Sequence, residues 1–196
     1  TIRVQGLNDL FHKTMFAADG KTTDPAKVSL QYVRLSFADG LTTAEATNGL
    51  SVALATSPHC ADGNLELLLH EKAVRILSSI VNSSDELFVG ISGKYAVFMK
   101  ENLFFSSMMF AGKYLAGSRI LERVQPAYQA MTDAGSLTDQ IQNVSALFLE
   151  GDDPCVDLYI ESDNITLRAE TASGHSSSAI KAADTTPTPK DGFHFD

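Results

Sequence analysis

The side chains in this chain that could do chemistry include five histidines, His12, His59, His70, His175 and His194. They show neither an i, i+4 spacing nor the H-E-x-x-H pattern that would place two imidazoles on one metal ion. The sequence also lacks a G-x-S-x-G nucleophile elbow and a G-K-[ST] phosphate loop. No pattern assembles a catalytic constellation, and we expect no enzyme.

Two further polar segments could suggest a catalytic site. The segment GHSSS at 174–178 joins a histidine to serines, but no motif places a base and an orienting acid beside it. Asp152 and Asp153 fall in an acidic turn, where solvation is the ordinary role. Cys60 and Cys155 have no C-x-x-C partner, which argues against a disulfide framework or a structural zinc site. No cofactor and no metal are expected.

The composition is that of a globular protein. Of 196 residues, 44% are hydrophobic, but no apolar run approaches the length of about 18 residues that a membrane span needs. We therefore expect no membrane partner, and a reducing cytoplasm fits the two cysteines best. Residues 1–124 hold 12 of the 15 basic and 12 of the 24 acidic residues, so the net charge of -9 arises in the last third.

Hydrophobic periodicity predicts helices and strands in turn. Apolar residues at i, i+3 and i+4 predict a helix over 7–15 and a second helix over 70–81. In the second helix, the residues predicted to face the core are Ala73, Val74, Leu77, Ile80 and Val81. The residues predicted to face solvent are Lys72, Arg75, Ser78 and Ser79. Alternation predicts strands with Val33, Leu35 and Phe37 on one face. The other predicted strands are 41–48, 51–56, 65–69, 86–92, 95–101 and 102–110.

The pattern of the first strands returns later in the chain. VRLSFADGLTTAEAT (33–47) is similar to VDLYIESDNITLRAET (156–171): Val33 matches Val156, Leu35 matches Leu158 and, after a one-residue slip, Thr42 matches Thr166. A helix over 137–147 precedes the second copy, and by this register His194 corresponds to His70. We interpret residues 1–124 as a complete module and 125–196 as the first part of a truncated second one. A chance similarity is the alternative. The polar segment 172–192 is expected to be partly mobile.

Three motifs resemble a known family in order and spacing. ATNG at 46–49, KAVRILSSIVNSSDELFVGIS at 72–92 and FFSSMMFAGKYLAGSRIL at 104–121 resemble segments of the bacterial sliding clamp, the DNA polymerase III beta subunit. The resemblance covers essentially the whole chain, as the middle domain plus the start of the C-terminal domain. It implies an α+β fold of tandem clamp modules, with antiparallel sheets outside and two helices per module on the inner face.

The resemblance also implies a function without catalysis. A clamp is a DNA replication processivity factor, a homodimer ring that encircles double-stranded DNA without sequence specificity and binds short hydrophobic peptides of polymerase and clamp loader. By position, the DNA-facing candidates are Lys13, Lys27, Lys72 and Arg75. For each of these, a plain solvated charge is the alternative.

The peptide pocket implied by the family falls on residues from several predicted elements. They are Leu30, Thr47, Gly49, Leu50, Val52, Leu115 and Ile120. A glycine lets another backbone approach closely, and nearby aliphatics can hold Leu or Phe anchors. Asn48-Gly49 can instead simply make a type I′ hairpin.

The sequence departs from the family pattern at three places. Asn48 replaces an acidic residue, Ser51-Val52 replaces a basic-Leu pair, and residues 114–117 lack the family's proline. A divergent or impaired peptide pocket is therefore an alternative. A strand-rich surface adhesion or ligand-binding module with no DNA role is the alternative function, favoured if the two halves formed a closed sandwich without helices at their interface.

Overall fold

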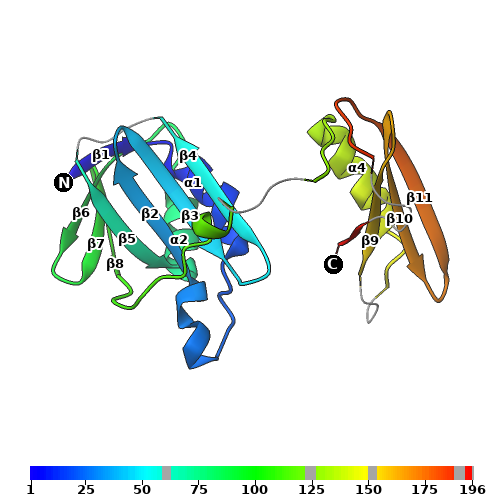
Figure 1. Ribbon diagram of the computed structural model, residues 1–196. Helices are drawn as coiled ribbons and strands as arrows, with labels where there is room; N and C mark the ends of the chain where they lie inside the picture. The colour runs from blue at the N-terminus through cyan, green and yellow to red at the C-terminus, as the bar shows by residue number, and fades with distance from the viewer. Residues whose placement is uncertain (59–62, 122–126, 150–153, 188–192, 196) are drawn as a thin grey trace. The chain divides into compact units, whose positions relative to one another are not determined.

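A computed structural model describes residues 1–58, 63–121, 127–149, 154–187 and 193–195. The chain divides into two compact units, Thr1–Val124 and Gln125–Asp196, which we call unit 1 and unit 2 (Figure 1). Each unit combines antiparallel sheet with helix, so the predicted α+β class is confirmed. Cys60, Asp152 and Asp153 are not among the described residues.

Unit 1 contains two antiparallel sheets. One has the order β1-β6-β7-β8, with strands Ile2–Gln5, Glu86–Ser92, Tyr95–Lys100 and Leu103–Met108. The other has the order β4-β3-β2-β5, with strands Val52–Ser57, Leu41–Thr47, Tyr32–Ala38 and Leu65–His70. A bridge between Leu69 and Met109 connects β5 to the end of β8.

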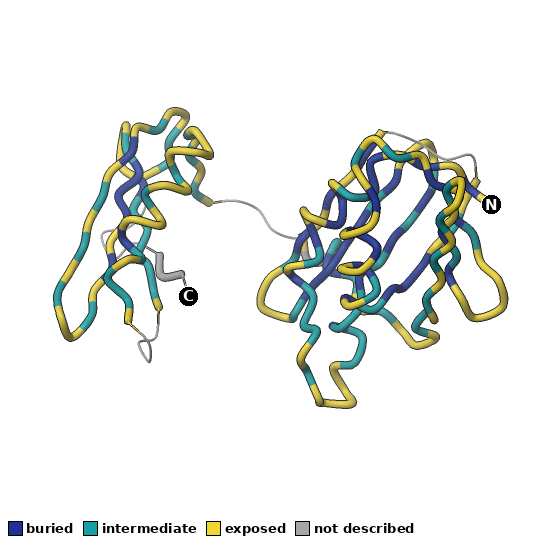
Figure 2. The backbone as a smooth tube through the Cα atoms, turned by 180° about the vertical axis from the view of Figure 1, so that it is seen from behind, coloured by how far each residue is buried: buried dark blue, intermediate teal, exposed yellow. Residues whose placement is uncertain are grey.

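Two helices of unit 1 lie against the inner face of the β4-β3-β2-β5 sheet, and a short third helix, α3 (Ser118–Leu121), follows the last strand and contacts β4. Helix α1 (Leu7–Thr14) packs on β3 and β4, and α2 (Glu71–Ile80) packs on α1, β2 and β5. Val33, Leu35 and Phe37 are buried in the core between sheet and helices, as their alternation predicts. Figure 2 shows the buried stretches of backbone along the strands and helices of the chain. The core of unit 1 is therefore formed by sheet and helices together. Among the described residues, no helix is long and apolar enough to cross a membrane.

The burial of side chains on α2 differs from the prediction at two positions, one on each face of the helix. Ser78 is buried, because its hydroxyl points to α1 and donates to Asn8 Oδ1 at 2.6 Å. Ile80 is 45% exposed, because it lies one turn after the exposed Ile76, beside the buried face formed by Val74 and Leu77. Lys72 and Arg75 are exposed as predicted.

Unit 2 contains one helix and one sheet among its described residues. Helix α4 (Ala134–Ser145) packs on a sheet of order β11-β10-β9-β12, with strands Gly174–Lys181, Asn164–Thr171, Val156–Ile160 and Phe193–Phe195. The expectation of mobility is wrong for residues 174–181. This segment pairs with β10 along its whole length and buries Ile180, which holds it as a strand.

Two of the four-stranded sheets have the same pairing register. They are β4-β3-β2-β5 of unit 1 and β11-β10-β9-β12 of unit 2, each packed against helix. Leu35 lies opposite Ala44 and Phe37 opposite Thr42; 123 residues later, Leu158 lies opposite Leu167 and Ile160 opposite Ile165. The predicted repeat of these strands is therefore present, but the one-residue slip is wrong. Thr42 corresponds to Ile165, because both hairpins turn over the same number of residues.

The register also corrects the match of His194. His194 pairs with Asp157, the counterpart of Arg34, whereas the residue that pairs with Arg34 is Leu68. His194 therefore corresponds to Leu68 rather than to His70.

Candidate functional site

The loop at Asn48-Gly49 is a hairpin turn between β3 and β4. Thr47 pairs with Val52, and the Asn48 N–H donates to the Ser51 carbonyl at 3.3 Å, which leaves Gly49 and Leu50 as the central residues. Gly49 has a φ of 90°, while Leu50 is not among the residues with positive φ. A type I′ turn needs positive φ at both central positions, so the predicted type I′ hairpin at Asn48-Gly49 is shifted by one residue and differs in type.

Hydrogen bonds of the Asn48 and Thr47 side chains hold this turn in place. Asn48 Oδ1 accepts from the Leu50 and Ser51 N–H groups at 2.9 and 2.7 Å. The buried Thr47 hydroxyl donates to the Ser51 carbonyl at 2.7 Å and accepts from the Gly49 N–H at 3.1 Å. These bonds fix the backbone of Gly49, and a Cβ built there would meet only Leu30 Cδ1, at 3.7 Å. The backbone at Gly49 is thus rigid and open to an approaching chain.

A segment after β8, residues 109–118, crosses the outer face of the β4-β3-β2-β5 sheet; we call it the strap. Its first anchor is Phe110, which stacks on Tyr32 with ring centroids 4.7 Å apart. Its far end lies on β4 at Gly117, where a Cβ would meet Val52 Cγ1 at 2.6 Å. Only glycine permits this close approach to Val52.

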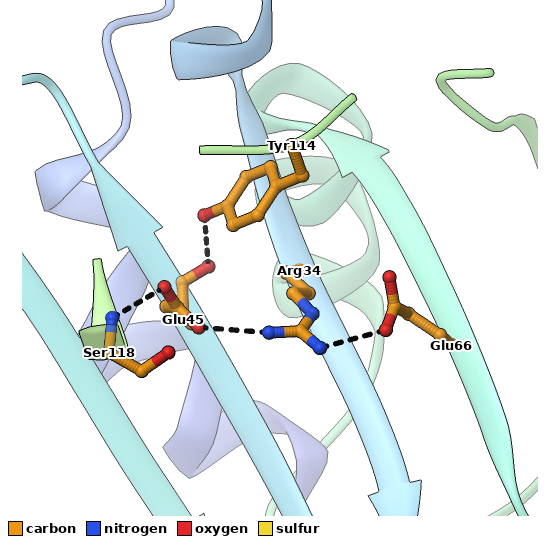
Figure 3. A network of polar contacts seen from close by, with 5 residues as sticks. All are labelled: Arg34, Glu45, Glu66, Tyr114 and Ser118. Atoms are coloured by element: carbon orange, nitrogen blue, oxygen red, sulfur yellow. Dashed lines mark hydrogen bonds and ion pairs between the residues drawn. The ribbon is translucent and has the colours of Figure 1, made fainter. Parts of the chain in front are cut away.

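The middle of the strap is held by a polar network on β2 and β3 (Figure 3). Glu45 is 2% exposed, and its carboxylate accepts from the Ser118 N–H at 2.9 Å and from Arg34 at 3.4 Å. Arg34 also donates to Glu66 at 2.8 Å. The Tyr114 hydroxyl donates to the Glu45 carbonyl oxygen at 3.1 Å. The Tyr114 and Ser118 bonds hold the strap on the sheet, and the two Arg34 bonds join β2 to β3 and to β5.

Burial and charge shift the pKa values of this network. The hydrogen bond to Glu66 raises the pKa of Arg34, and the neighbouring carboxylates add to the effect. Burial raises the pKa of Tyr114 well above its usual 10.0, and the negative charge of Glu45 raises it further. The phenol therefore stays neutral and keeps donating its hydrogen bond at physiological pH.

A groove lies where the strap, the turn and the 3-10 helix η2 (Pro25–Gln31) meet. Asp24 caps η2 by accepting from the Ala26 N–H at 2.9 Å, and Pro25 fixes its first turn. The groove has a volume of about 530 Å³ and is lined by Ala26, Lys27, Ser29, Leu30, Gly49, Lys113, Tyr114 and Leu115. Its floor and walls are mainly apolar, with few polar groups. This is the character of a small binding site for an extended peptide or ligand.

The structure brings together part of the predicted pocket. Leu30, Gly49 and Leu115 line the groove, with Leu30 buried and Leu115 50% exposed. Thr47 and Val52 instead lie behind it, Thr47 bracing the turn and Val52 supporting Gly117. Leu50 is 98% exposed at the tip of the turn. The side chain of Ile120 lies outside the described residues.

Sequence reasoning missed several lining residues, including Lys113 and Tyr114. No periodic pattern marks the strap, because it is neither helix nor strand between Phe110 and Gly117. A usable signal exists for η2, since Asp24-Pro25 is a capping residue followed by proline at the first helical position.

The DNA-facing candidates occupy two different places. Lys13 in α1, and Lys72 and Arg75 in α2, are exposed on the two helices that pack together. Arg75 donates to Glu71 at 2.8 Å through Nε, and this pair reduces its free charge. Lys27 lies on η2 at the groove instead of on a helix that packs with α1.

Solved structures with the same fold are bacterial clamps. The chain superposes on the DNA polymerase sliding clamp of Bacillus subtilis with a TM-score of 0.82 at 19% identity, covering 95% of this chain and 50% of that one. The DNA polymerase III subunit beta of Pseudomonas aeruginosa gives 0.79 at 15% identity, covering 94% and 52%. A sliding clamp from the same organism, bound to griselimycin, gives 0.77 at 14%, covering 94% and 50%.

The chain has the sliding-clamp fold. At these identities the likeness establishes the fold, and the chain spans about half the length of the clamps it matches. No protein-family model and no curated protein matches the sequence. The sliding-clamp fold was the expectation from the motifs at 46–49, 72–92 and 104–121, and that expectation is confirmed.

Proposed function

We propose that this chain is part of a ring-shaped processivity clamp of DNA replication and that the groove beside Gly49 receives short hydrophobic peptides of a polymerase and a clamp loader. The observation that carries the proposal is the groove itself, on a sliding-clamp fold. A rigid glycine turn and two aliphatic side chains, Leu30 and Leu115, meet there from elements far apart in sequence.

The groove suits weak and exchangeable binding. Burying one aliphatic or aromatic anchor contributes roughly 1.5 to 3 kcal/mol, so one or two anchors give an affinity that partners can share in turn. Because the turn and the strap are already held by hydrogen bonds, little ordering is required when a peptide docks.

The proposed action on DNA is topological and needs no catalysis. A closed ring of such modules, a homodimer in the intact protein, would hold duplex DNA by enclosure. Lys13, Lys72 and Arg75 would then touch phosphates without reading sequence, a contact that salt weakens.

A fluorescence-polarisation titration tests the peptide part of the proposal. The probe is a labelled pentapeptide with Leu and Phe anchors, Gln-Leu-Asn-Leu-Phe. We expect saturable binding by the wild-type chain, loss of binding in Gly49→Arg, and weaker binding in Leu115→Ser. Ala172→Arg is the matched control, because Ala172 occupies the equivalent turn between β10 and β11 and should leave binding unchanged.

Thermal unfolding of each variant separates lost binding from lost folding. A folded Gly49→Arg protein that binds the peptide as tightly as wild type would rule out the groove as the peptide site. Equal loss of binding in Ala172→Arg would point in the same direction.

A further inference from the structure

His70 lies where β5 ends and α2 begins, and its imidazole caps the helix. It directly precedes Glu71, the first residue of α2, and its Nδ1 atom accepts a hydrogen bond from the Lys72 N–H at 3.1 Å. The first N–H groups of a helix have no partner within the helix, so this bond satisfies one of them. Serine, threonine, aspartate and asparagine usually fill this position. Histidine differs from them because its acceptor atom can be protonated near neutral pH.

The cap bond defines the form of the imidazole. A nitrogen that accepts a hydrogen bond carries no proton, so His70 is neutral and its proton lies on Nε2. Protonation of Nδ1 would turn the acceptor into a donor that faces another donor, the Lys72 N–H. It would also place a positive charge at the positive end of the α2 dipole. Both effects oppose protonation of His70 in the folded chain.

Burial and the nearest charges act on the same ring. Burial of the imidazole is the main cause that lowers the pKa of His70 from its ordinary 6.5, and the positive charge of Lys72 lowers it further. The carboxylate of Glu71 opposes this shift, but it also accepts a hydrogen bond from Arg75. The neutral ring is therefore the form that the folded state favours.

The elements packed on β5 and α2 bring further charged or titratable groups. Arg34 on β2 is engaged by Glu45 and Glu66. The 3-10 helix η1 (Met15–Ala17), which packs on α2, has no titratable side chain. The titratable side chains that β2 and α1 add are Tyr32, Asp9, His12 and Lys13. Since His12 is the other histidine among these groups, a variant of it serves as the control below.

Ring contacts hold the imidazole in its capping orientation. His70 pairs with Tyr32 in the register of β5 with β2, and the two rings meet nearly perpendicularly with centroids 5.2 Å apart. Tyr32 in turn stacks on Phe110, the first anchor of the strap. Gly112 folds back over Phe110, since a Cβ at this position would collide with the ring. The imidazole thus connects the start of α2 to the anchor of the strap.

We propose that His70 is an acid-sensitive switch, which holds the first turn of α2 while Nδ1 is unprotonated and releases that turn when Nδ1 gains a proton. On release, the Lys72 N–H loses its acceptor and the contact between His70 and Tyr32 changes. The switch requires neither DNA nor a peptide, although α2 carries Lys72 and Arg75, two of the DNA-facing candidates.

The direction of the pH dependence follows from the favoured form. Because folding favours neutral His70, its contribution to stability is fully present above the unfolded pKa of 6.5. That contribution is lost as the pH falls through the lower pKa of the folded state. Acid therefore weakens the start of α2, and a return to neutral pH restores it.

An NMR titration of the full chain from about pH 8 to about pH 5 tests the switch directly. At the upper limit, the imidazole nitrogen signals should place the proton of His70 on Nε2. As the pH falls, the Lys72 amide signal should move with the same midpoint as the His70 ring, below 6.5, and the Tyr32 ring signals should follow. A proton on Nδ1 at the upper limit, or a Lys72 amide that does not follow the ring, would overturn the proposal.

Two substitutions separate the switch from a plain structural role. His70→Asn keeps a capping side chain that does not titrate, whereas His70→Ala removes the cap at every pH. Hydrogen exchange of the α2 amides, expressed as protection factors, removes the intrinsic effect of pH. From about pH 7.5 to about pH 5, wild type should lose protection about two- to thirtyfold, as a lost N-cap predicts. His70→Asn should lose none, and His70→Ala should be weakly protected at both limits. His12→Gln should keep the wild-type loss.

Three results would contradict the switch. If His70→Asn loses protection with acid as wild type does, another group causes the response. If His12→Gln abolishes the loss, the response belongs to α1. If wild-type α2 stays protected while the His70 ring is protonated, the cap does not depend on Nδ1. Should His70→Ala fail to fold, His70→Asn and the titration still decide. Each of these results leaves the proposed peptide and DNA functions untouched.

Discussion

The sheets β4-β3-β2-β5 and β11-β10-β9-β12 share strand order and register, yet their outer faces differ. Arg34 lies opposite Glu45 on the first sheet, and at the equivalent positions of the second Asp157 lies opposite Arg168, so the acid and the base have exchanged strands. Glu45 is buried under the strap, whereas Arg168 is exposed, with its guanidinium 4.8 Å from the centre of the Tyr159 ring. The outer face of the second sheet carries a hollow of about 450 Å³ whose lining includes Asp157, Arg168 and His175, so the two sheets share a scaffold and differ in the chemistry of their outer faces.

The helix-facing sides differ as well. In unit 1, α1 and α2 bury most of the inner residues of the sheet, and Leu35 has no exposed surface. In unit 2, α4 leaves an apolar hollow of about 570 Å³ lined by Leu137, Ile141, Ser145, Phe148, Pro154, Val156, Leu158 and Leu167. Of these two depressions, the groove of unit 1 has the glycine turn and the two lysines Lys27 and Lys113 in its lining, and the apolar hollow of unit 2 has neither.

The largest expected effect comes from deleting the same side chain in both sheets. Leu35→Ala removes a fully buried leucine and should lower the free energy of unfolding of unit 1 by about 3 to 5 kcal/mol. Leu158→Ala removes a half-buried one and should cost unit 2 no more than about 1 to 2 kcal/mol. Urea denaturation followed by circular dichroism measures both. Equal losses would contradict the difference in packing.

The next largest effect on stability is expected at Glu45 and Arg168, which occupy equivalent positions in the two sheets. Glu45→Ala leaves the Ser118 N–H without its acceptor and Arg34 with one carboxylate instead of two, so we expect a loss of about 2 to 3 kcal/mol. Arg168→Ala removes an exposed cation and its ring contact and should cost less than about 1 kcal/mol. The same denaturation experiment applies. A cost at Arg168 as large as at Glu45 would show that burial under the strap does not strengthen the pair.

A smaller effect comes from the strap's hydroxyl group. Tyr114→Phe loses one partly buried hydrogen bond and should cost about 1 kcal/mol near pH 7, with weaker peptide binding because the strap forms a wall of the groove. The folded state raises the pKa of Tyr114, so its contribution is fully present below the unfolded pKa of 10.0 and is lost as the pH rises above it.

The stability gap between wild type and Tyr114→Phe should therefore narrow from pH 9 towards pH 11, measured by urea denaturation at each pH. A gap that widens with pH would contradict burial of a neutral phenol at this position.

The smallest expected effect is on DNA. Replacing Lys72 or Lys13 by Ser should weaken binding to duplex DNA of any sequence and reduce the slope of log affinity against log salt by roughly one per lysine. Filter binding at several salt concentrations measures the slope. Lys181→Ser in β11 is the matched control from unit 2. An unchanged slope in the helix variants would assign Lys13 and Lys72 to the solvated surface.

The strands and helices could be predicted because burial leaves a periodic pattern. Val33, Leu35 and Phe37 alternate in the sequence as they alternate in the sheet, and Val74 and Leu77 follow the helical period. Ser78 departs from the predicted burial pattern because its hydroxyl is hydrogen-bonded to Asn8, 70 residues away in sequence. A serine that is satisfied across two helices carries no local sign of its burial.

The groove was predictable only in part. Gly49 and its neighbours came from a resemblance, while Lys113 and Tyr114 sit on a segment without periodic structure. The position of the strap depends on tertiary contacts, namely Tyr114 with Glu45 and Gly117 with Val52. Contacts between residues about 65 to 70 positions apart are not encoded in any short window, so the walls of the groove required the structure.

The most direct test of peptide binding at the groove is a methyl-selective NMR titration of the chain with the Gln-Leu-Asn-Leu-Phe peptide. The groove and the hollow of unit 2 each carry leucine methyl groups, so one spectrum compares the two apolar sites. We predict saturable shifts for Leu30 and Leu115, with Leu158 and Leu167 unmoved. Shifts confined to Leu158 and Leu167 would contradict the account and place the peptide in unit 2.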